Sequence, residues 1–143
     1  MYIPKHFIIQ ELLPMAFFKE YESYGERLWY LFDDRVLWTA DQLREIYGGM
    51  IVNTWHKGGK IQFRGWRPWD CKTGALMSQH KFGRALDLMP MKPTAKIIRR
   101  DILADPTRPE FKYITCIEEG TSWLHFDVRN FDRVNRGLLV VNG

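Results

Sequence analysis

The spacing of His80, Gly83 and Asp87 restricts how the middle of this chain can run. Seven residues separate His80 from Asp87, and on a single helix that separation corresponds to two turns, or about 10 Å, too far for the two side chains to share a metal ion. Gly83 permits a tight reversal of the backbone. We therefore expect His80 to end a loop and residues 84–88 to continue as a strand that returns Asp87 beside it.

A second segment, residues 123–128, has the alternating pattern of a strand, in which neighbouring side chains point to opposite faces. One face carries Trp123, His125 and Asp127, and the other carries Leu124, Phe126 and Val128. A strand next to residues 84–88 would present His125 to His80 and Asp87. Two imidazoles and a carboxylate with an open fourth position are the ligand set of a catalytic zinc ion. The pattern therefore predicts one Zn²⁺ held by His80, Asp87 and His125.

These segments also resemble a known family. The pattern S-x-H-x-x-G-x-A-x-D over residues 78–87, followed by W-x-H-x-D over residues 123–127, resembles the zinc D-alanyl-D-alanine carboxypeptidases. Their family includes dipeptidases, L-alanyl-D-glutamate endolysins and the related hedgehog signalling domain. The resemblance extends loosely over residues 28–128. It implies a hedgehog/DD-peptidase-like fold, the three metal ligands already named, and a substrate in the peptidoglycan stem peptide.

Substrate-binding roles follow from the same resemblance. Residues 65–67, Gly-Trp-Arg, are similar to the family's G-Y-R segment, which implies that Arg67 contacts substrate near the metal. A planar, permanently charged guanidinium suits a substrate carboxylate or the oxyanion of a transition state, and Arg64 is the fallback. Ser78 is either a cap or turn residue or, as the resemblance implies, a hydrogen-bonding partner of substrate. Trp123 is a core aromatic or a pocket aromatic that contacts substrate.

The catalytic base is the position at which the chain departs from many family members. They carry a glutamate three residues before the last histidine, where this chain has Ser122, which cannot serve as a base. Glu118 and Glu119 lie seven and six residues before His125, and other members place an acidic residue six before. If the turn at residues 120–122 closes a hairpin, alternation directs only one of the two glutamates toward the metal. We favour Glu119 as the base and keep Glu118 in reserve.

The expected chemistry is hydrolysis of a peptide bond. Zinc lowers the pKa of its bound water to about 7 and polarises the scissile carbonyl. The base takes the proton of that water and later passes it to the leaving amine, for which it must lie within about 3 Å. The resemblance leaves open a D-Ala-D-Ala carboxypeptidase and an endolysin-type endopeptidase. The alternative is a catalytically inactive metal-binding or cell-wall-binding domain, which the serine at position 122 favours.

The remaining candidate residues have simpler interpretations. His6 and His56 lie outside any such pattern and are expected to be ordinary hydrogen-bonded or exposed side chains. Asp127 has two interpretations of similar weight. It either holds the imidazole of His125, as partners of metal ligands commonly do, or pairs with Arg129 or Arg133 at the surface.

The chain is the right size for one domain, since 143 residues with 45% hydrophobic content can enclose a single core. We divide it into a helical N-terminal extension, residues 1–27, and a catalytic core, residues 28–128. Predicted elements are helical segments at 6–32 (interrupted by Pro14 and Gly25), 39–47 (with Thr39 as N-cap) and 94–103, and strands at 51–55, 61–66 (strand or loop), 84–88, 114–119 and 123–128. The sum is an α+β fold with a small, largely antiparallel sheet covered by helices.

Charge and hydropathy limit the partners. The chain has 21 basic and 17 acidic residues, an excess that would favour anionic polymers such as a bacterial cell wall but would also attract nucleic acid. No nucleic-acid-binding motif supports a nucleic-acid partner. Lys96, Arg99 and Arg100 are expected to form a solvated helix face. No stretch approaches the roughly 20 apolar residues of a membrane span, and no signal sequence is visible. We therefore expect no membrane span, no nucleic-acid partner and synthesis in the cytoplasm, with delivery to the wall by a phage route.

Overall fold

The fold is α+β, as expected from the sequence, and the computed structural model describes all residues, 1–143. The α-helices are α1 (Met15–Tyr21), α2 (Asp34–Tyr47), α3 (Ala95–Ala104) and α4 (Arg133–Arg136). Short 3₁₀-helices are η1 (Ile9–Glu11), η2 (Glu22–Leu31), η3 (Trp55–Lys57), η4 (Gln79–Phe82) and η5 (Pro109–Phe111). The strands are β1 (Met50–Ile51), β2 (Ala85–Pro90), β3 (Cys116–Glu119), β4 (Leu124–Asp127) and β5 (Leu139–Asn142).

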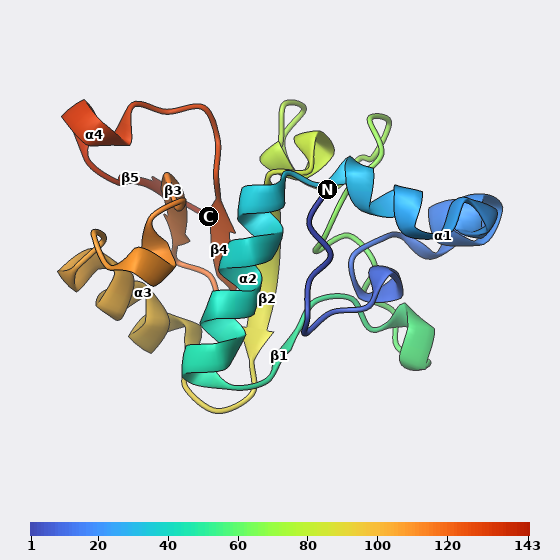
Figure 1. Ribbon diagram of the computed structural model, residues 1–143, viewed down its shortest axis with the longest axis horizontal. Coiled ribbons are helices and arrows are strands. Elements are labelled where there is room, and N and C mark those ends of the chain that lie inside the picture. The colour runs from blue at the N-terminus through green and yellow to red at the C-terminus, as the bar shows by residue number, and fades with distance from the viewer.

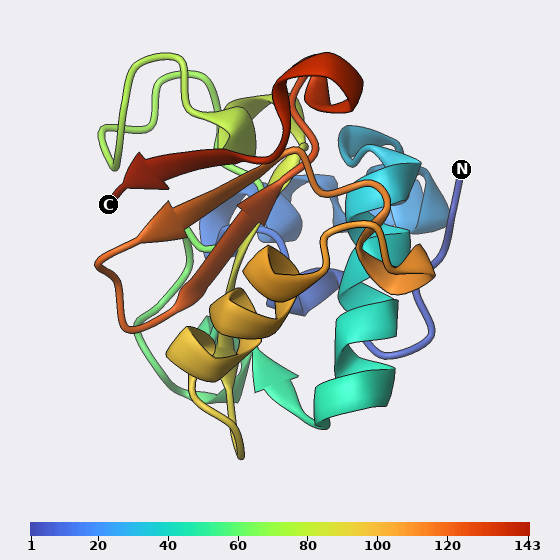
Figure 2. The same cartoon turned by 90° about the vertical axis from the view of Figure 1, so that its left-hand side faces the viewer.

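The five strands form one open sheet in the order β1-β2-β4-β3-β5. Every neighbouring pair is antiparallel except β3 and β5, which run parallel at one edge of the sheet. The predicted hairpin is present, because β3 and β4 pair directly across the turn that joins them. Figure 2 shows these two strands and β5 side by side, with α3 packed across them. The expectation of a largely antiparallel sheet is therefore confirmed.

Alternation along the strands separates two faces of the sheet. Leu86, Phe126 and Ile117 are fully buried in one hydrophobic cluster together with residues of α2 and α3. The side chains between them, such as Asp87 and His125, lie on the opposite face, where polar groups replace apolar ones. The core face thus holds the helices against the sheet, and the other face is available for a site.

Helix α2 begins earlier than expected. Asp33 is its N-cap and accepts a hydrogen bond from the backbone N–H of Arg35, as short polar side chains at this position commonly do. Thr39, the predicted cap, is buried inside the helix instead. The predicted start was wrong because the apolar face of the helix extends further toward the N-terminus, to Val36 and Leu37, and Asp33 is the cap residue in front of it. Helix α3 was predicted closely, with Thr94 accepting from the N–H of Ile97.

The basic face of α3 also differs from expectation. Arg99 is buried, and its guanidinium donates to the carbonyl oxygens of Thr121 and Trp123 at 3.0 and 2.9 Å. It therefore ties α3 to the β3–β4 turn rather than facing solvent. Lys96 and Arg100 are exposed, as expected.

Both ends of the chain pack into the same domain: the N-terminal segment contributes to its core and the C-terminal segment to its sheet. Phe7, Leu12 and Leu13 lie in the hydrophobic cluster that includes the residues of α2, so residues 1–27 share their core with residues 28–128. Figure 1 shows α1 at one end of the molecule and β5 with α4 at the other. The last 15 residues contribute β5 to the sheet beside β3. None of the helices has the length and apolar character that crossing a bilayer would require.

Candidate metal centre

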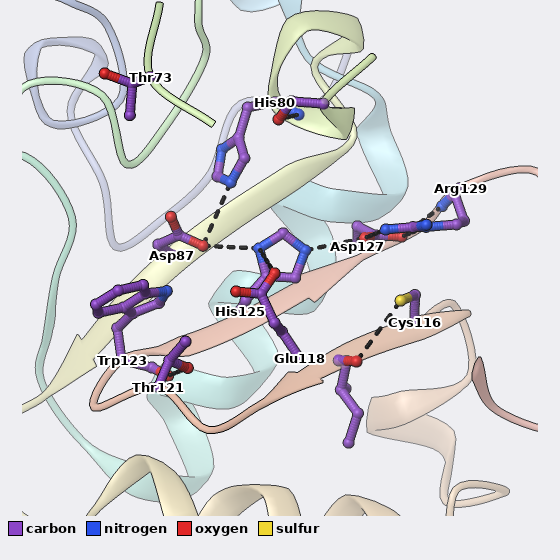
Figure 3. Close-up of polar contacts among 12 residues, drawn as sticks. Thr73, His80, Asp87, Cys116, Glu118, Thr121, Trp123, His125, Asp127 and Arg129 are labelled. Carbon is purple, nitrogen blue, oxygen red and sulfur yellow. Dashed lines mark hydrogen bonds and ion pairs between the residues drawn. The ribbon is translucent and has the colours of Figure 1, made fainter. Parts of the chain in front are cut away.

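The register of the sheet places three acidic or imidazole side chains in a row. Asp87 of β2 lies directly opposite His125 of β4. On the other side of β4, Cys116 pairs with Asp127 and Ile117 with Phe126, and continuing this register brings Glu118 of β3 opposite His125. Because side chains alternate along each strand, all three point to the same face. Figure 3 shows Asp87, His125 and Glu118 from three adjacent strands on that face.

His80 reaches the same place from outside the sheet. It lies in η4, where the Ser78 side chain accepts from the N–H of His80 and Gly83 ends the helix with a φ of 68°. A side chain at Gly83 would also collide with the carbonyl oxygen of Leu31, so glycine is required at the reversal. The chain then enters β2 and returns Asp87 toward His80, as the spacing predicted.

The two histidines and the aspartate form a buried group that can hold a metal ion, with one ligand atom of each within 4.8 Å of the others. Asp87 Oδ1 lies 3.3 Å from His80 Nε2 and 2.7 Å from His125 Nδ1. A tetrahedral ion with bonds of about 2.1 Å separates its ligands by about 3.4 Å. The first distance already has this value, and the second requires a shift of less than about 1 Å. The donor set therefore fits a small divalent cation.

Each imidazole is oriented by a partner on its other nitrogen. His80 Nδ1 lies 2.7 Å from the carbonyl oxygen of Gly65, and since a carbonyl only accepts, Nδ1 carries the proton and Nε2 keeps a free lone pair. His125 Nε2 lies 2.9 Å from Asp127 Oδ2, which likewise leaves Nδ1 to face Asp87. Such partners fix the tautomer and the ring orientation of metal-binding histidines.

Asp127 combines two of the interpretations left open by the sequence. Besides holding His125, its carboxylate accepts two hydrogen bonds from the guanidinium of Arg129, at 2.8 and 2.6 Å. The pair is buried on the aspartate side. Arg133 does not take part, because it donates to backbone carbonyls that include Phe111 and Ile114. The two hydrogen bonds from Arg129 therefore hold the Asp127 carboxylate in position next to His125.

The local field favours opposite protonation states in the two histidines. Burial lowers the pKa of His80, which keeps its imidazole neutral. Burial also opposes a charge on His125, but the hydrogen bonds that its ring donates to Asp127 and Asp87 outweigh it and raise its pKa to about 9. Burial likewise opposes ionisation of Asp87, yet the two imidazoles hold the pKa of its carboxyl below the usual value. Without a cation, protonated His125 lies between the carboxylates of Asp87 and Asp127 and donates to both.

A pocket of about 370 Å³ opens onto these side chains. Its walls come from the loop before η4, from strands β2 to β5 and from the β3–β4 turn. It is lined by Arg67, Thr73, Gly74, Ala75, Ser78, His80, Asp87, Glu118, Trp123, His125, Asn142 and Gly143. A ligand in this pocket would meet the open side of the metal-binding group.

Of the two candidate bases, Glu118 faces the pocket. Its Oε2 lies 3.9 Å from His125 Nδ1, and its side chain lines the metal pocket. Glu119 lines a different hollow, beside α3, together with Lys96 and Arg100. Glu118, the reserve candidate, therefore lies beside the metal ligands and the favoured Glu119 does not, and only one of the two glutamates faces the metal ligands, as expected. Buried Ile117 carried the missing signal, since its neighbour Glu118 must point away from the core.

The expected substrate-contacting residues line the same pocket. Arg67 is buried and lies 3.4 Å from Asp87 Oδ2, while its Nε donates to the Phe63 carbonyl at 2.6 Å. Burial lowers the pKa of Arg67 despite the nearby charge of Asp87. Ser78 is both the cap of η4 and a pocket residue, 3.4 Å from Arg67 Nη1. Trp123 lines the pocket, and the fallback Arg64 lies over its ring at 5.6 Å.

Some pocket residues were not expected from the sequence. Asn142 and Gly143 reach the pocket because β5 pairs with β3 in parallel, opposite Glu118 and Glu119. No motif marks residues 139–143, and the short apolar run at residues 138–141 is the only sequence signal for a strand there. Thr73–Ala75 belong to the loop before η4, which forms no helix or strand.

The two other histidines lie outside this group. His6 is partly exposed and lies 3.4 Å from Glu45. His56 packs edge-on against Trp55, and both of its ring nitrogens are buried without a hydrogen-bond partner. The metal-binding group therefore contains two of the four histidines of the chain.

Comparisons of the chain with protein-family models, with curated proteins and with solved structures each find no match.

Proposed function

We propose that this protein is a zinc-dependent peptidase. One observation carries the proposal: His80, Asp87 and His125 form a buried three-ligand group that opens onto a pocket lined by a glutamate and an arginine. Catalytic zinc sites keep three protein ligands and one exchangeable position, whereas structural sites are closed by four. The fit of this donor set to a tetrahedral cation, with each imidazole held by a partner on its far nitrogen, supports zinc.

The chain supplies a proton acceptor in the pocket. When bound, zinc supplies Lewis-acid polarisation of a carbonyl and acidification of a water molecule. Glu118 is the proposed general base: its Oε2 accepts a proton from the attacking water and later returns it to the leaving amine. Its position 3.9 Å from the ligand nitrogen of His125 supports this role. Ser122 does not need to act as the base.

Arg67 is the proposed anchor for negative charge in the pocket. Its Nε is held by the Phe63 carbonyl and its Nη2 lies 3.4 Å from Asp87, so the guanidinium is fixed before substrate arrives. A fixed cation in a buried position suits either the terminal carboxylate of a peptide or the oxyanion that forms during hydrolysis. The buried setting strengthens both interactions because it excludes water.

The proposed substrate is the peptidoglycan stem peptide, and this part rests on the sequence resemblance. A carboxypeptidase that removes a terminal D-alanine needs Arg67 for the free carboxylate, whereas an endopeptidase does not. Comparing a stem peptide that has a free carboxylate with its amidated form distinguishes the two. A carboxypeptidase would cleave the peptide with the free carboxylate and not the amidated form. Arg67→Ala would abolish this difference in cleavage rate. Equal cleavage of both peptides would identify an endopeptidase.

The direct test is hydrolysis of purified peptidoglycan by the zinc-loaded protein. We expect release of new peptide termini, its loss on chelation and its recovery when zinc is restored. Glu118→Gln provides a control that keeps the metal ligands and removes the proton acceptor. Metal binding without any hydrolysis would contradict a peptidase and would identify the protein as the inactive metal-binding domain considered above.

A further inference from the structure

A second surface lies on the outside of the loop that forms one wall of the metal pocket. Trp69 and Phe82, here called the aromatic platform, pack edge to face with their ring centroids 5.7 Å apart. Trp69 is 57% exposed and Phe82 is 40% exposed. Large aromatic side chains placed this way contribute little to the core, and exposed apolar surface of this kind commonly marks a binding site.

The platform packs against a buried cation. Lys81 is only 9% exposed, its ammonium lies 5.4 Å from the centre of the Trp69 ring, and it donates to the carbonyl oxygen of Leu76 at 3.1 Å. Burying a lysine is unfavourable unless its charge is compensated. Lys81 therefore connects the indole of Trp69 to the backbone of the loop at Leu76, while Trp69 remains more than half exposed. A ring ordered in advance loses little entropy when a ligand binds to it.

The platform and the metal centre are parts of one segment. Along η4, His80 points inward to the metal-binding group and Phe82, two residues later, points outward. In the loop before η4, Thr73, Gly74 and Ser78 line the metal pocket, while Trp69 lies on the outer surface. One segment of the chain, residues 69–82, therefore supplies both the platform and a wall of the pocket.

We propose that the aromatic platform binds the pyranose rings of a polysaccharide. The flat C–H face of a pyranose packs against an exposed aromatic ring, and its hydroxyl groups remain in water around the edge. The cations next to the rings, Lys81 under Trp69 and Arg84 at 5.9 Å from the Phe82 ring, suit a glycan that also carries carboxylates. That the bound polysaccharide also carries the peptide cleaved at the metal pocket rests on the proposed function. Sugar binding itself does not require the metal.

The probe is a soluble N-acetylglucosamine hexamer, titrated calorimetrically into the full chain with and without zinc. We expect binding in both states, and we expect Trp69→Ala and Phe82→Ala to weaken it about tenfold. Trp69→Phe keeps a ring and should retain most of the affinity. The matched control is Tyr24→Ala, because Tyr24 is also exposed and has the cation of Arg27 over its ring at 4.9 Å, and it should bind like the parent.

The outcomes separate the two proposals. Sugar binding that depends on Trp69, without any peptide hydrolysis, supports the platform and contradicts the peptidase. Hydrolysis of stem peptide by a protein that does not bind the hexamer overturns the platform alone. Trp69-dependent binding to phosphatidylglycerol vesicles, or Trp69-dependent self-association in ultracentrifugation, with no binding of the hexamer, also overturns it in favour of a membrane or a second copy of the chain.

Discussion

The two faces of the sheet use the same strands for opposite purposes. On the core face, Leu86 and Phe126 pack with residues of α2 and α3 and contain no polar atom that needs a partner. On the site face, Asp87, His125 and Asp127 are equally buried but are joined to one another by hydrogen bonds of 2.7 and 2.9 Å. Successive residues along β2 and β4 therefore alternate between the hydrophobic core and the metal-binding face.

The difference has an energetic meaning. Apolar burial on the core face stabilises the fold in proportion to the area removed from water. Burial of carboxylates and imidazoles costs free energy unless each is paired, and here each partner also orients a metal ligand. We therefore expect substitutions on the core face to change stability, and those on the site face to change metal binding and catalysis.

The largest effect is expected on the site face, at Glu118. Glu118→Gln removes the proton acceptor with little change in shape, and general-base catalysis contributes about 10² to 10⁴ in rate. We predict a loss of that size in kcat for stem-peptide hydrolysis, with metal content unchanged. Glu119→Gln is the matched control, since Glu119 lines the hollow beside α3, and its kcat should equal that of the parent. The reverse pattern would restore Glu119 as the base.

The largest effect on stability is expected on the core face. Phe126 is fully buried between the sheet and its helices, and phenylalanine-to-alanine changes at such sites cost about 3–5 kcal/mol. Chemical denaturation of Phe126→Ala measures this loss. Phe82→Ala, at a 40% exposed phenylalanine, should change the free energy of unfolding by less than about 1 kcal/mol. Similar losses in both variants would contradict the assignment of Phe126 to the hydrophobic core.

A smaller effect is expected behind the metal ligands. Asp127→Asn keeps the size of the side chain but weakens its hold on His125 and on Arg129. Loss of such a partner lowers metal affinity about 10- to 100-fold, which competition with a chelator measures. Asp132→Asn changes the exposed cap of α4 and should leave the affinity unaltered. Equal affinities in the parent and Asp127→Asn would show that Asp127 does not orient the imidazole.

The pH dependence gives the finest comparison. The pKa of His125 is raised to about 9, above the value of about 6.5 in an unfolded chain, so the metal-free protein carries this proton at pH 7. Its stabilising contribution is complete below about pH 6.5 and is lost as the pH rises through about 9. A cation must displace the same proton, so metal affinity should increase up to tenfold per pH unit over that interval.

Calorimetry in buffers with different ionisation enthalpies measures the proton released on metal binding. We expect about one proton per ion at pH 7 and none above about pH 10. Release of no proton at pH 7 would show that His125 Nδ1 is not the ligand atom.

Local signals in the sequence predicted much of the site. The spacing of His80, Gly83 and Asp87 predicted the reversal into β2, because a glycine in the left-handed region is a local requirement. Alternation over residues 123–128 predicted the orientation of His125, since Leu124 and Phe126 can only face the core. These features depend on neighbouring residues alone and could therefore be inferred without knowledge of the fold.

The remainder depended on contacts between distant segments. Thr39 has the chemistry of a cap, but Asp33 starts the helix, and both choices satisfy the local pattern. Arg99 is buried because its guanidinium donates to two carbonyl oxygens of the β3–β4 turn. The periodicity of the helix gives no information on such a contact with a distant segment. The contribution of β5 to the pocket requires the parallel pairing with β3, and such pairing is decided by tertiary structure.

Metal analysis of the purified protein beside two histidine variants tests the metal centre most directly. We predict about one zinc ion per chain in the parent protein and in His6→Ala, because His6 lies apart from the site beside Glu45. We predict none in His80→Ala, which removes one of the three ligands and leaves the sheet intact. An unchanged metal content in His80→Ala, or no bound metal in the parent after incubation with zinc, would contradict the site.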